Sequence, residues 1–275
     1  MLEQFKGRGA VVTGGARGIG RALTLALAEA GLSVAILDVD EAAGAETADA
    51  AQKRGVEALA VRCDVSLPDD LDHAYKEVER ALGVPGLLWA NTGVGAMGGV
   101  LSNPDENLDW VYGVNVLGMA RTLRRFVGPM REAGRPGHVG ITASVAGLTP
   151  IRSYAALYGA SKFGVIGLAE ALRAELGEAN DPIGVTVLCP GLVATRIWDA
   201  GRARPERFGG ATSLPEEVGQ RWREEGMDPA WIARVALERA DAGGGYVTPV
   251  DPHSKDDLQA RHDMLLRSMV YPDQD

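Results

Sequence analysis

The feature that most constrains this chain is a regular alternation of short, β-branched apolar runs with longer amphipathic stretches. The apolar runs predict buried strands, and the stretches between them have the length and periodicity of helices. Strands joined through helices form βαβ units, so the alternation predicts a parallel sheet covered on both faces. We therefore expect one α/β domain over residues 1–275, a doubly wound parallel sheet of the Rossmann type flanked by helices. The expected strands are Gly9–Thr13, Ser33–Asp38, Ala58–Cys63, Leu87–Ala90, His138–Ala143 and Ile183–Leu188, the last closing the series. The expected helices are Ile19–Ala30, Ala42–Arg54, Pro68–Leu82, Asp105–Val127 and Ala155–Glu178.

Two segments interrupt this alternation. Residues 194–226 become rich in Gly, Pro, Arg and Glu, especially from Ala203 on, which favours either a mobile lid over a substrate or a solvated surface insertion. Residues 251–271 predict a helical tail that packs on the body or on a neighbouring subunit. The apolar side expected for this helix comprises Leu258, His262, Leu265 and Leu266.

Composition excludes several classes of partner. A net charge of -9 and a pI near 5.1 argue against nucleic acids and anionic membranes, which would repel the chain. No apolar run reaches the roughly 20 residues that span a bilayer, and the first residues lack the pattern of a secretory signal. We expect a cytoplasmic protein in which Cys63 and Cys189 are buried free thiols. The four histidines are scattered, so no metal site is predicted.

A glycine-rich turn directly follows the first expected strand. Gly14 allows a sharp turn, Gly18 allows the backbone to approach a diphosphate, and Gly20 allows the following helix to pack closely on the sheet. The helix N-terminus adds unpaired N–H groups and the positive end of the helix dipole. This turn predicts a dinucleotide site that also includes Arg17 and Ile19.

Asp38 ends the second expected strand, about 20 residues after the glycines, where a carboxylate binds the adenosine ribose hydroxyls. A 2′-phosphate at this position would meet like charge, a repulsion on the order of 4 kcal/mol before screening. Arg17 could halve that value or reduce it further. Asp38 therefore favours NAD as the cofactor over its phosphorylated form.

The spacing Thr13-Gly14-x-x-x-Gly18-x-Gly20 resembles the short-chain dehydrogenase/reductase family. The resemblance extends continuously from about Phe5 to Thr195 and more loosely to Val250. It implies an NAD-dependent oxidoreductase that transfers hydride between NAD(H) and a small secondary alcohol or ketone, acting as a homodimer or homotetramer. The other matching segments, in order, are Asp64-Val65, Ala90-Asn91-Thr92-Gly93, Asn115, Ser144, Tyr158-x-x-x-Lys162 and Pro190-Gly191.

Four residues carry the expected chemistry. Tyr158 and Lys162 lie one helical turn apart, and a phenol with a pKa near 10 becomes a useful base only beside positive charge. Tyr158 is thus expected to exchange a proton with the substrate, with Lys162 and the positive ring of oxidised nicotinamide lowering its pKa. The resemblance implies that Lys162 also binds the nicotinamide ribose. Ser144, at a strand end, would hold the substrate oxygen. The resemblance implies that Asn115 interrupts its helix and supports a water on a proton path to the lysine.

The resemblance also assigns the remaining cofactor contacts. These are Asp64 and Val65 at the adenine, Asn91 and Gly93 beneath the ribose, and Pro190, Gly191, Val193 and Thr195 around the nicotinamide carboxamide.

The sequence departs from the family pattern at three places. Ala90-Asn91-Thr92-Gly93 replaces the usual Asn-Asn-Ala-Gly segment, and the interval from Ser144 to Tyr158 is one residue longer than is commonest. The usual ending of the seventh strand is replaced by 243–251, which puts a tetramer contact through that strand in doubt. Leu148, Trp198 and Trp222 suit either a substrate pocket or ordinary surface packing.

Two alternative functions remain open at this stage. A 3-oxoacyl thioester reductase would normally prefer the phosphorylated cofactor, against which Asp38 counts. A non-catalytic NAD-binding sensor or scaffold would usually lack the tyrosine or the lysine, and this chain has both.

Overall fold

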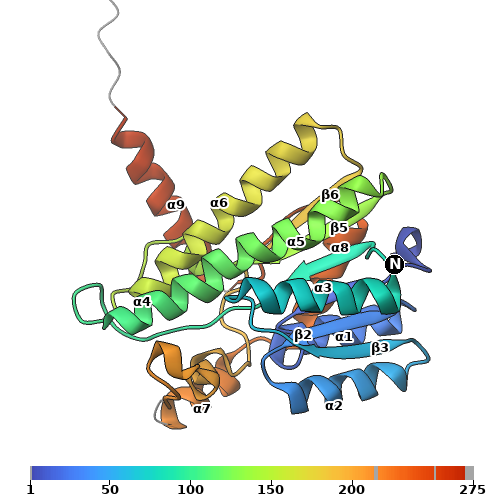
Figure 1. Cartoon of the computed structure of the whole chain (residues 1–275). Helices are drawn as coiled ribbons and strands as arrows, with labels where there is room; N and C mark the ends of the chain where they lie inside the picture. Colours follow the sequence, from blue (N-terminus) through green and yellow to red (C-terminus); the bar gives the residue numbers. More distant parts are fainter. Residues whose placement is uncertain (1, 214–215, 251, 270–275) are drawn as a thin grey trace, which may run out of the picture.

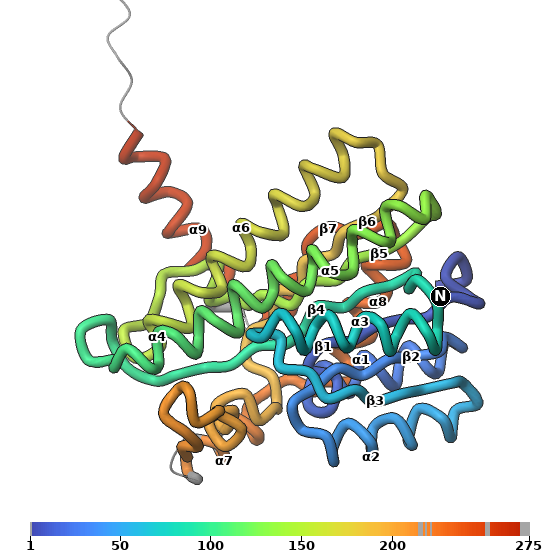
Figure 2. Tube along the Cα trace, viewed as in Figure 1, coloured from blue at the N-terminus to red at the C-terminus, as the bar shows by residue number. Residues whose placement is uncertain are grey.

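A computed structural model describes residues 2–213, 216–250 and 252–269. Seven strands form one parallel sheet in the order β3-β2-β1-β4-β5-β6-β7 (Figures 1 and 2). This confirms the predicted doubly wound fold. The strands are β1 (Ala10–Thr13), β2 (Val34–Asp38), β3 (Ala58–Arg62), β4 (Leu87–Ala90), β5 (Gly137–Thr142), β6 (Ile183–Leu188) and β7 (Gly244–Val247).

Helices cover both faces of the sheet. One apolar core joins the sheet to α3, α5 and α6, and a second core joins it to α1 and α8. The helices are α1 (Gly18–Glu29), α2 (Glu41–Gln52), α3 (Pro68–Leu82), α4 (Asp105–Tyr112), α5 (Met119–Glu132), α6 (Ala156–Glu178), α7 (Glu216–Glu225), α8 (Pro229–Asp241) and α9 (Pro252–Arg267).

The structure corrects the expected end of the sheet. β6 does not close the series, because β7 pairs with it in parallel. Two of the four residues of β7 are glycine, which strands disfavour, and this explains why the apolar pattern missed the strand. The expected helix Asp105–Val127 is also divided, since a π-helical turn at Gly113–Gly118 separates α4 from α5.

The pairing register brings the strands to a common edge. Thr13 lies opposite Leu37 and Ala90, and Thr142 lies opposite Leu188. The chain order reverses between β1 and β4, which is the point where open α/β sheets bind ligands outside the carboxyl ends of their strands.

The apolar side predicted for the C-terminal helix does not pack on the body, and packing on a neighbouring subunit stays a prediction. α9 projects from the body, and Leu258, Leu265 and Leu266 are 38%, 41% and 50% exposed (Figure 1). Its body contacts include Asp257 with Arg152. The apolar side expected to pack therefore faces outward in the single chain, and positions 251, 270 and 271 of the predicted tail lie outside the described residues.

The 194–226 segment forms two short 3-10 helices, Ile197–Ala203 and Glu206–Phe208, followed by α7. Positions 214 and 215 lie outside the described residues. Over the described chain, no helix combines the length and apolar character needed to cross a bilayer.

Close packing between β4 and β5 depends on one glycine. Trp89 is fully buried, and its indole N–H donates to the Thr142 hydroxyl over 3.0 Å. Gly140 lies opposite Trp89 on β5, and a Cβ at that position would come within 2.3 Å of the indole ring. The tryptophan therefore occupies the space that any side chain at position 140 would need.

We predict opposite effects for two Gly→Ala substitutions. Gly140→Ala should reduce the free energy of unfolding by about 1–3 kcal/mol, because the indole and the sheet would have to shift. Gly167→Ala, on exposed α6 surface with nothing within 4 Å of the added methyl group, should stabilise the protein by up to about 1 kcal/mol. Chemical denaturation of both variants provides the measurement. Equal stabilities of the two variants would contradict the packing argument.

Candidate active site

A cavity of about 480 Å³ lies at the carboxyl edge of the sheet. Of the predicted cofactor-binding residues, Gly20 alone does not line it. Those that do are Gly14, Arg17, Gly18, Ile19, Asp38, Asp64, Val65, Asn91, Gly93, Tyr158, Lys162, Pro190, Gly191, Val193 and Thr195. Strand pairing thus gathers residues from the whole first two thirds of the chain around one space.

The glycine turn has the backbone conformation that its sequence predicts. Gly14 and Gly18 have φ values of +62° and +52°, in the region that favours glycine. A Cβ at Gly20 would come within 1.9 Å of the Gly14 carbonyl oxygen. The absence of a side chain at Gly20 therefore allows α1 to pack closely against the turn, behind the cavity wall. No side chain caps the N-terminus of α1. Its N–H groups face the cavity edge and fit the diphosphate of a dinucleotide.

Asp38 lies at the next strand end with both carboxylate oxygens partly engaged. One accepts the Ala16 N–H and the other the Asp40 N–H, each over 3.0 Å. Each oxygen keeps a further lone pair for ribose hydroxyls. Burial raises the pKa of Asp38, and these backbone hydrogen bonds oppose the rise.

Arg17 is paired beside this carboxylate. Its Nε donates to Asp40 Oδ2 over 2.8 Å, and Arg202 lies 3.7 Å from the same oxygen. Asp40 therefore neutralises much of the positive charge that could otherwise attract a 2′-phosphate.

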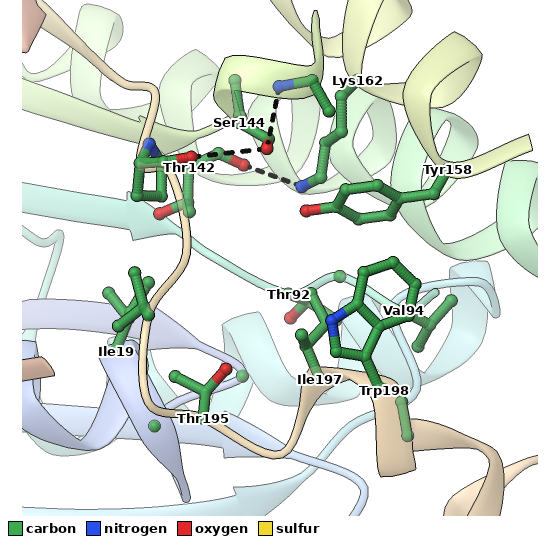
Figure 3. A pocket seen from close by; sticks show the side chains of 18 of the residues that line it. Ile19, Thr92, Val94, Thr142, Ser144, Tyr158, Lys162, Thr195, Ile197 and Trp198 are labelled. Carbon is green, nitrogen blue, oxygen red and sulfur yellow. Dashed lines mark hydrogen bonds between the residues drawn. The ribbon is translucent and has the colours of Figure 1, made fainter. Parts of the chain in front are cut away.

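Tyr158 and Lys162 extend from α6 into the cavity, as Figure 3 shows. Lys162 is 2% exposed, and its ammonium donates to the Thr142 carbonyl over 3.1 Å. The lysine Nζ lies 5.6 Å from the centre of the tyrosine ring. A Cβ at Gly93 would meet Nζ at 3.2 Å, so the glycine leaves room for the ammonium.

The ionisation of this pair differs from the sequence expectation. Burial raises the pKa of Tyr158 to about 12, and the Ser144 hydroxyl opposes the rise. Burial also lowers the pKa of Lys162 to about 8. In the protein alone, desolvation of the phenol outweighs any lowering of its pKa by the lysine. The lowering by lysine and oxidised nicotinamide together stays a prediction.

Ser144 follows β5 directly, at the cavity edge. Its hydroxyl accepts the Ala146 N–H over 3.1 Å and contacts the Pro190 carbonyl at 3.4 Å (Figure 3). The Tyr158 hydroxyl lies on the same side of the cavity as the Ser144 hydroxyl. A ligand oxygen can therefore contact both hydroxyls.

Asn115 does not line the cavity. It lies in the π-helical turn, 1% exposed, and its side chain accepts the Val94 N–H over 2.8 Å and donates to the Val94 carbonyl and to Ser161 Oγ. The implied interruption of the helix is confirmed. The contacts of Asn115 position the loop after β4 and the helix that carries Lys162.

An arginine that the sequence did not single out contacts Asp64, which lines the cavity. Arg207 donates to Asp64 Oδ2 over 2.5 Å and to Ser66 Oγ over 2.8 Å. Burial raises the pKa of Asp64, but hydrogen bonds from Ser66 and Arg207 outweigh it and hold the pKa below its usual value. The clustering of arginines at 202–207 was the available indication, although it does not specify their partners.

The three residues proposed for a substrate pocket do not all line the cavity. Trp198 and Trp222 line the cavity, and their ring centres lie 4.7 Å apart. Leu148 packs against the apolar core instead.

Comparisons with known proteins agree with this geometry. Residues 8–206 match the short chain dehydrogenase family. The fold superposes with a TM-score of 0.91 on a short-chain dehydrogenase/reductase from Burkholderia phymatum in complex with NAD, at 32% identity and with 99% of each chain covered. The chain is 36% identical over 261 residues to 1-deoxy-11-beta-hydroxypentalenate dehydrogenase of Streptomyces exfoliatus, covering 91% of this chain and 94% of the relative.

A further similarity is partial. The chain is 36% identical over 186 residues to the probable oxidoreductase EphD of Mycobacterium tuberculosis, which covers 68% of this chain but only 31% of EphD.

We predict that Arg207→Met destabilises the protein in a pH-dependent manner. The folded pKa of Asp64 lies below its unfolded value, so its stabilising interaction is complete above about pH 4 and is lost as the pH falls through the folded pKa. The free energy of unfolding should fall by about 1 kcal/mol at neutral pH, a modest amount because Arg207 is partly exposed. This decrease should become smaller in acid. Thermal unfolding at several pH values measures it.

The matched control is Arg234→Met, which removes an exposed pair with Glu238. It should have little effect at any pH. A loss for Arg207→Met that did not change between pH 7 and pH 3 would contradict the role given to Asp64.

Proposed function

The chain belongs to the short-chain dehydrogenase family, and from this premise we propose that it is an NAD-dependent oxidoreductase interconverting a secondary alcohol and its ketone. Membership of the family supports an oxidoreductase that uses a nicotinamide cofactor. The observation that carries the finer proposal is the convergence of Tyr158, Lys162 and Ser144 on the cavity that the glycine turn also lines.

The proposed cofactor site rests on residues with suitable chemistry. The uncapped N-terminus of α1 and the Gly14–Gly20 turn suit a diphosphate. Asp38 suits the ribose, and Val193 and Thr195, which line the same cavity, are proposed to hold the carboxamide. When bound, the nicotinamide ring supplies or accepts the hydride.

Tyr158 is the proposed acid and base. In ketone reduction its hydroxyl gives a proton to the substrate oxygen, and in alcohol oxidation it takes that proton back. Ser144 donates a hydrogen bond that orients the same oxygen, and the charged form of Lys162 favours the phenolate. The high phenol pKa of about 12 in the protein alone means that the base becomes effective only with additional positive charge in the cavity.

NAD is the proposed cofactor because of the charges around Asp38. Asp38 presents a carboxylate at the ribose position, while Asp40 pairs with Arg17. A 2′-phosphate would therefore meet the negative charge of the Asp38 carboxylate at close range. The segment 194–226, which lines the cavity through Trp198 and Trp222, is proposed to cover the substrate.

We predict that Tyr158→Phe lowers kcat by about 10²- to 10⁴-fold, since it removes the group that exchanges the proton. NADH binding, followed by fluorescence titration, should stay close to that of the unmodified protein. Tyr112→Phe, on α4 and outside the cavity, serves as the control and should keep its activity. Normal turnover by Tyr158→Phe on a panel of secondary alcohols would refute the assignment.

We also predict that Asp38→Asn weakens the preference for NAD. Half of the unscreened repulsion leaves about 2 kcal/mol, which corresponds to roughly 30-fold in the ratio of kcat/KM for NAD to that for NADP. Steady-state kinetics with both cofactors measures the ratio. Asp49→Asn, an exposed carboxylate change on α2, should leave it unchanged. A wild-type protein that used NADP more efficiently would overturn the proposal.

A further inference from the structure

Trp198 forms the wall of the cavity that faces the tyrosine. It lies in the 3-10 helix Ile197–Ala203, is 8% exposed, and its ring centre is 5.6 Å from that of Tyr158. A Cβ at Gly95 would meet the indole at 3.1 Å, so the ring is seated between the backbone at Gly95 and the tyrosine. The indole is therefore held in one place beside the proposed acid and base.

The indole N–H of Trp198 is buried and has no hydrogen-bond partner among the described residues. The Thr92 hydroxyl, which lines the same cavity, is likewise buried without a partner there. Figure 3 shows the nitrogen edge of the indole facing the open pocket on the side of Thr92. Leaving a buried polar group unpaired is unfavourable, so these two groups point to a polar atom of a bound ligand.

A second buried tryptophan of the chain has a hydrogen-bond partner for its indole N–H. Trp89 is fully buried, and its N–H donates to Thr142 Oγ1 over 3.0 Å. The unpaired donor at Trp198 thus differs from a buried indole that only completes the core. Indole N–H is a donor only, so its partner must be an acceptor.

We infer that Trp198 is a specificity-determining residue that donates its N–H to a second oxygen of the substrate, on the carbon next to the reacting one. The inference rests on the proposed alcohol and ketone chemistry. The reacting oxygen would meet Tyr158 and Ser144. The ring centres of Tyr158 and Trp198 lie 5.6 Å apart, which is close enough for one small fragment to contact both side chains. The substrate class is accordingly a ketone or carbinol with a vicinal hydroxyl, ether or carbonyl oxygen.

The neighbouring wall reinforces this selectivity. Val94, Ile197 and Trp222 line the cavity near Trp198, and their side chains offer no oxygen acceptor. A substrate without the vicinal oxygen leaves the N–H buried and unpaired. Sites that hydrogen-bond a substrate atom discriminate against analogues that lack it for this reason.

The direct test observes the Trp198 indole N–H by NMR. The protein labelled with ¹⁵N at tryptophan is saturated with NADH, and the resonance is assigned through Trp198→Phe. Acetophenone and α-methoxyacetophenone are then added separately to Tyr158→Phe, which prevents turnover. We expect α-methoxyacetophenone alone to shift this resonance downfield, while exposed Trp231 stays unchanged. A shift with both ketones, or with neither, overturns the inference.

Kinetics provide the second readout. The unmodified protein should prefer α-methoxyacetophenone to acetophenone in kcat/KM, and Trp198→Phe should reduce that preference about tenfold, the size of one hydrogen bond. Trp231→Phe, the same aromatic change at an exposed position of α8 outside the cavity, should preserve the preference. The inference fails if Trp198→Phe keeps the preference, or if it weakens NADH binding instead, which would assign the donor to the cofactor.

The two proposals can fail separately. Retained turnover by Tyr158→Phe would remove the proposed acid and base, whatever the behaviour of the indole resonance. If the Trp198 indole resonance does not respond to the vicinal oxygen, the specificity role of Trp198 is refuted. The proposed role of Tyr158 is unaffected by that result.

Discussion

The in-register pairing of seven parallel strands is the constraint on which the site depends. It ends β1, β4 and β5 at one edge, so the glycine turn, the loop after β4 and Ser144 open on the same cavity. The reversal of chain order beside β1 separates the connecting helices and leaves the crevice between them. Residues far apart in the sequence become neighbours because of strand pairing, before any side chain contributes.

The parts of the fold that follow from local pattern could be predicted from the sequence. Apolar runs identified β1 to β6, and the strand-to-helix glycines located the cofactor end of the cavity. The pattern missed β7 because Gly244 and Gly245 carry no apolar side chain. It also could not predict the contact of Arg207 with Asp64, which joins residues 143 positions apart and depends on how the segment after β6 folds back.

Burial sets the chemistry of the reactive pair. The same desolvation raises the pKa of Tyr158 to about 12 and lowers that of Lys162 to about 8, so both groups are mainly neutral between about pH 8 and pH 12. The sequence places the two groups one turn apart and suggests that attraction between charges dominates. In the protein alone, the pKa values of both groups depend mainly on how deeply α6 is packed against the sheet. This depth is a property of the tertiary structure, which the local sequence does not show. Charge must therefore enter the cavity before the phenol can release its proton.

The arginines after β6 connect the two ends of the cavity. Arg202 lies near Asp40, and Arg207 binds Asp64. Trp198 belongs to the same 3-10 helix as Arg202, so contacts at the cofactor end also fix the indole beside Tyr158. The segment that carries Trp198 is thus held in part by two carboxylates, Asp40 and Asp64, that follow other strands of the sheet.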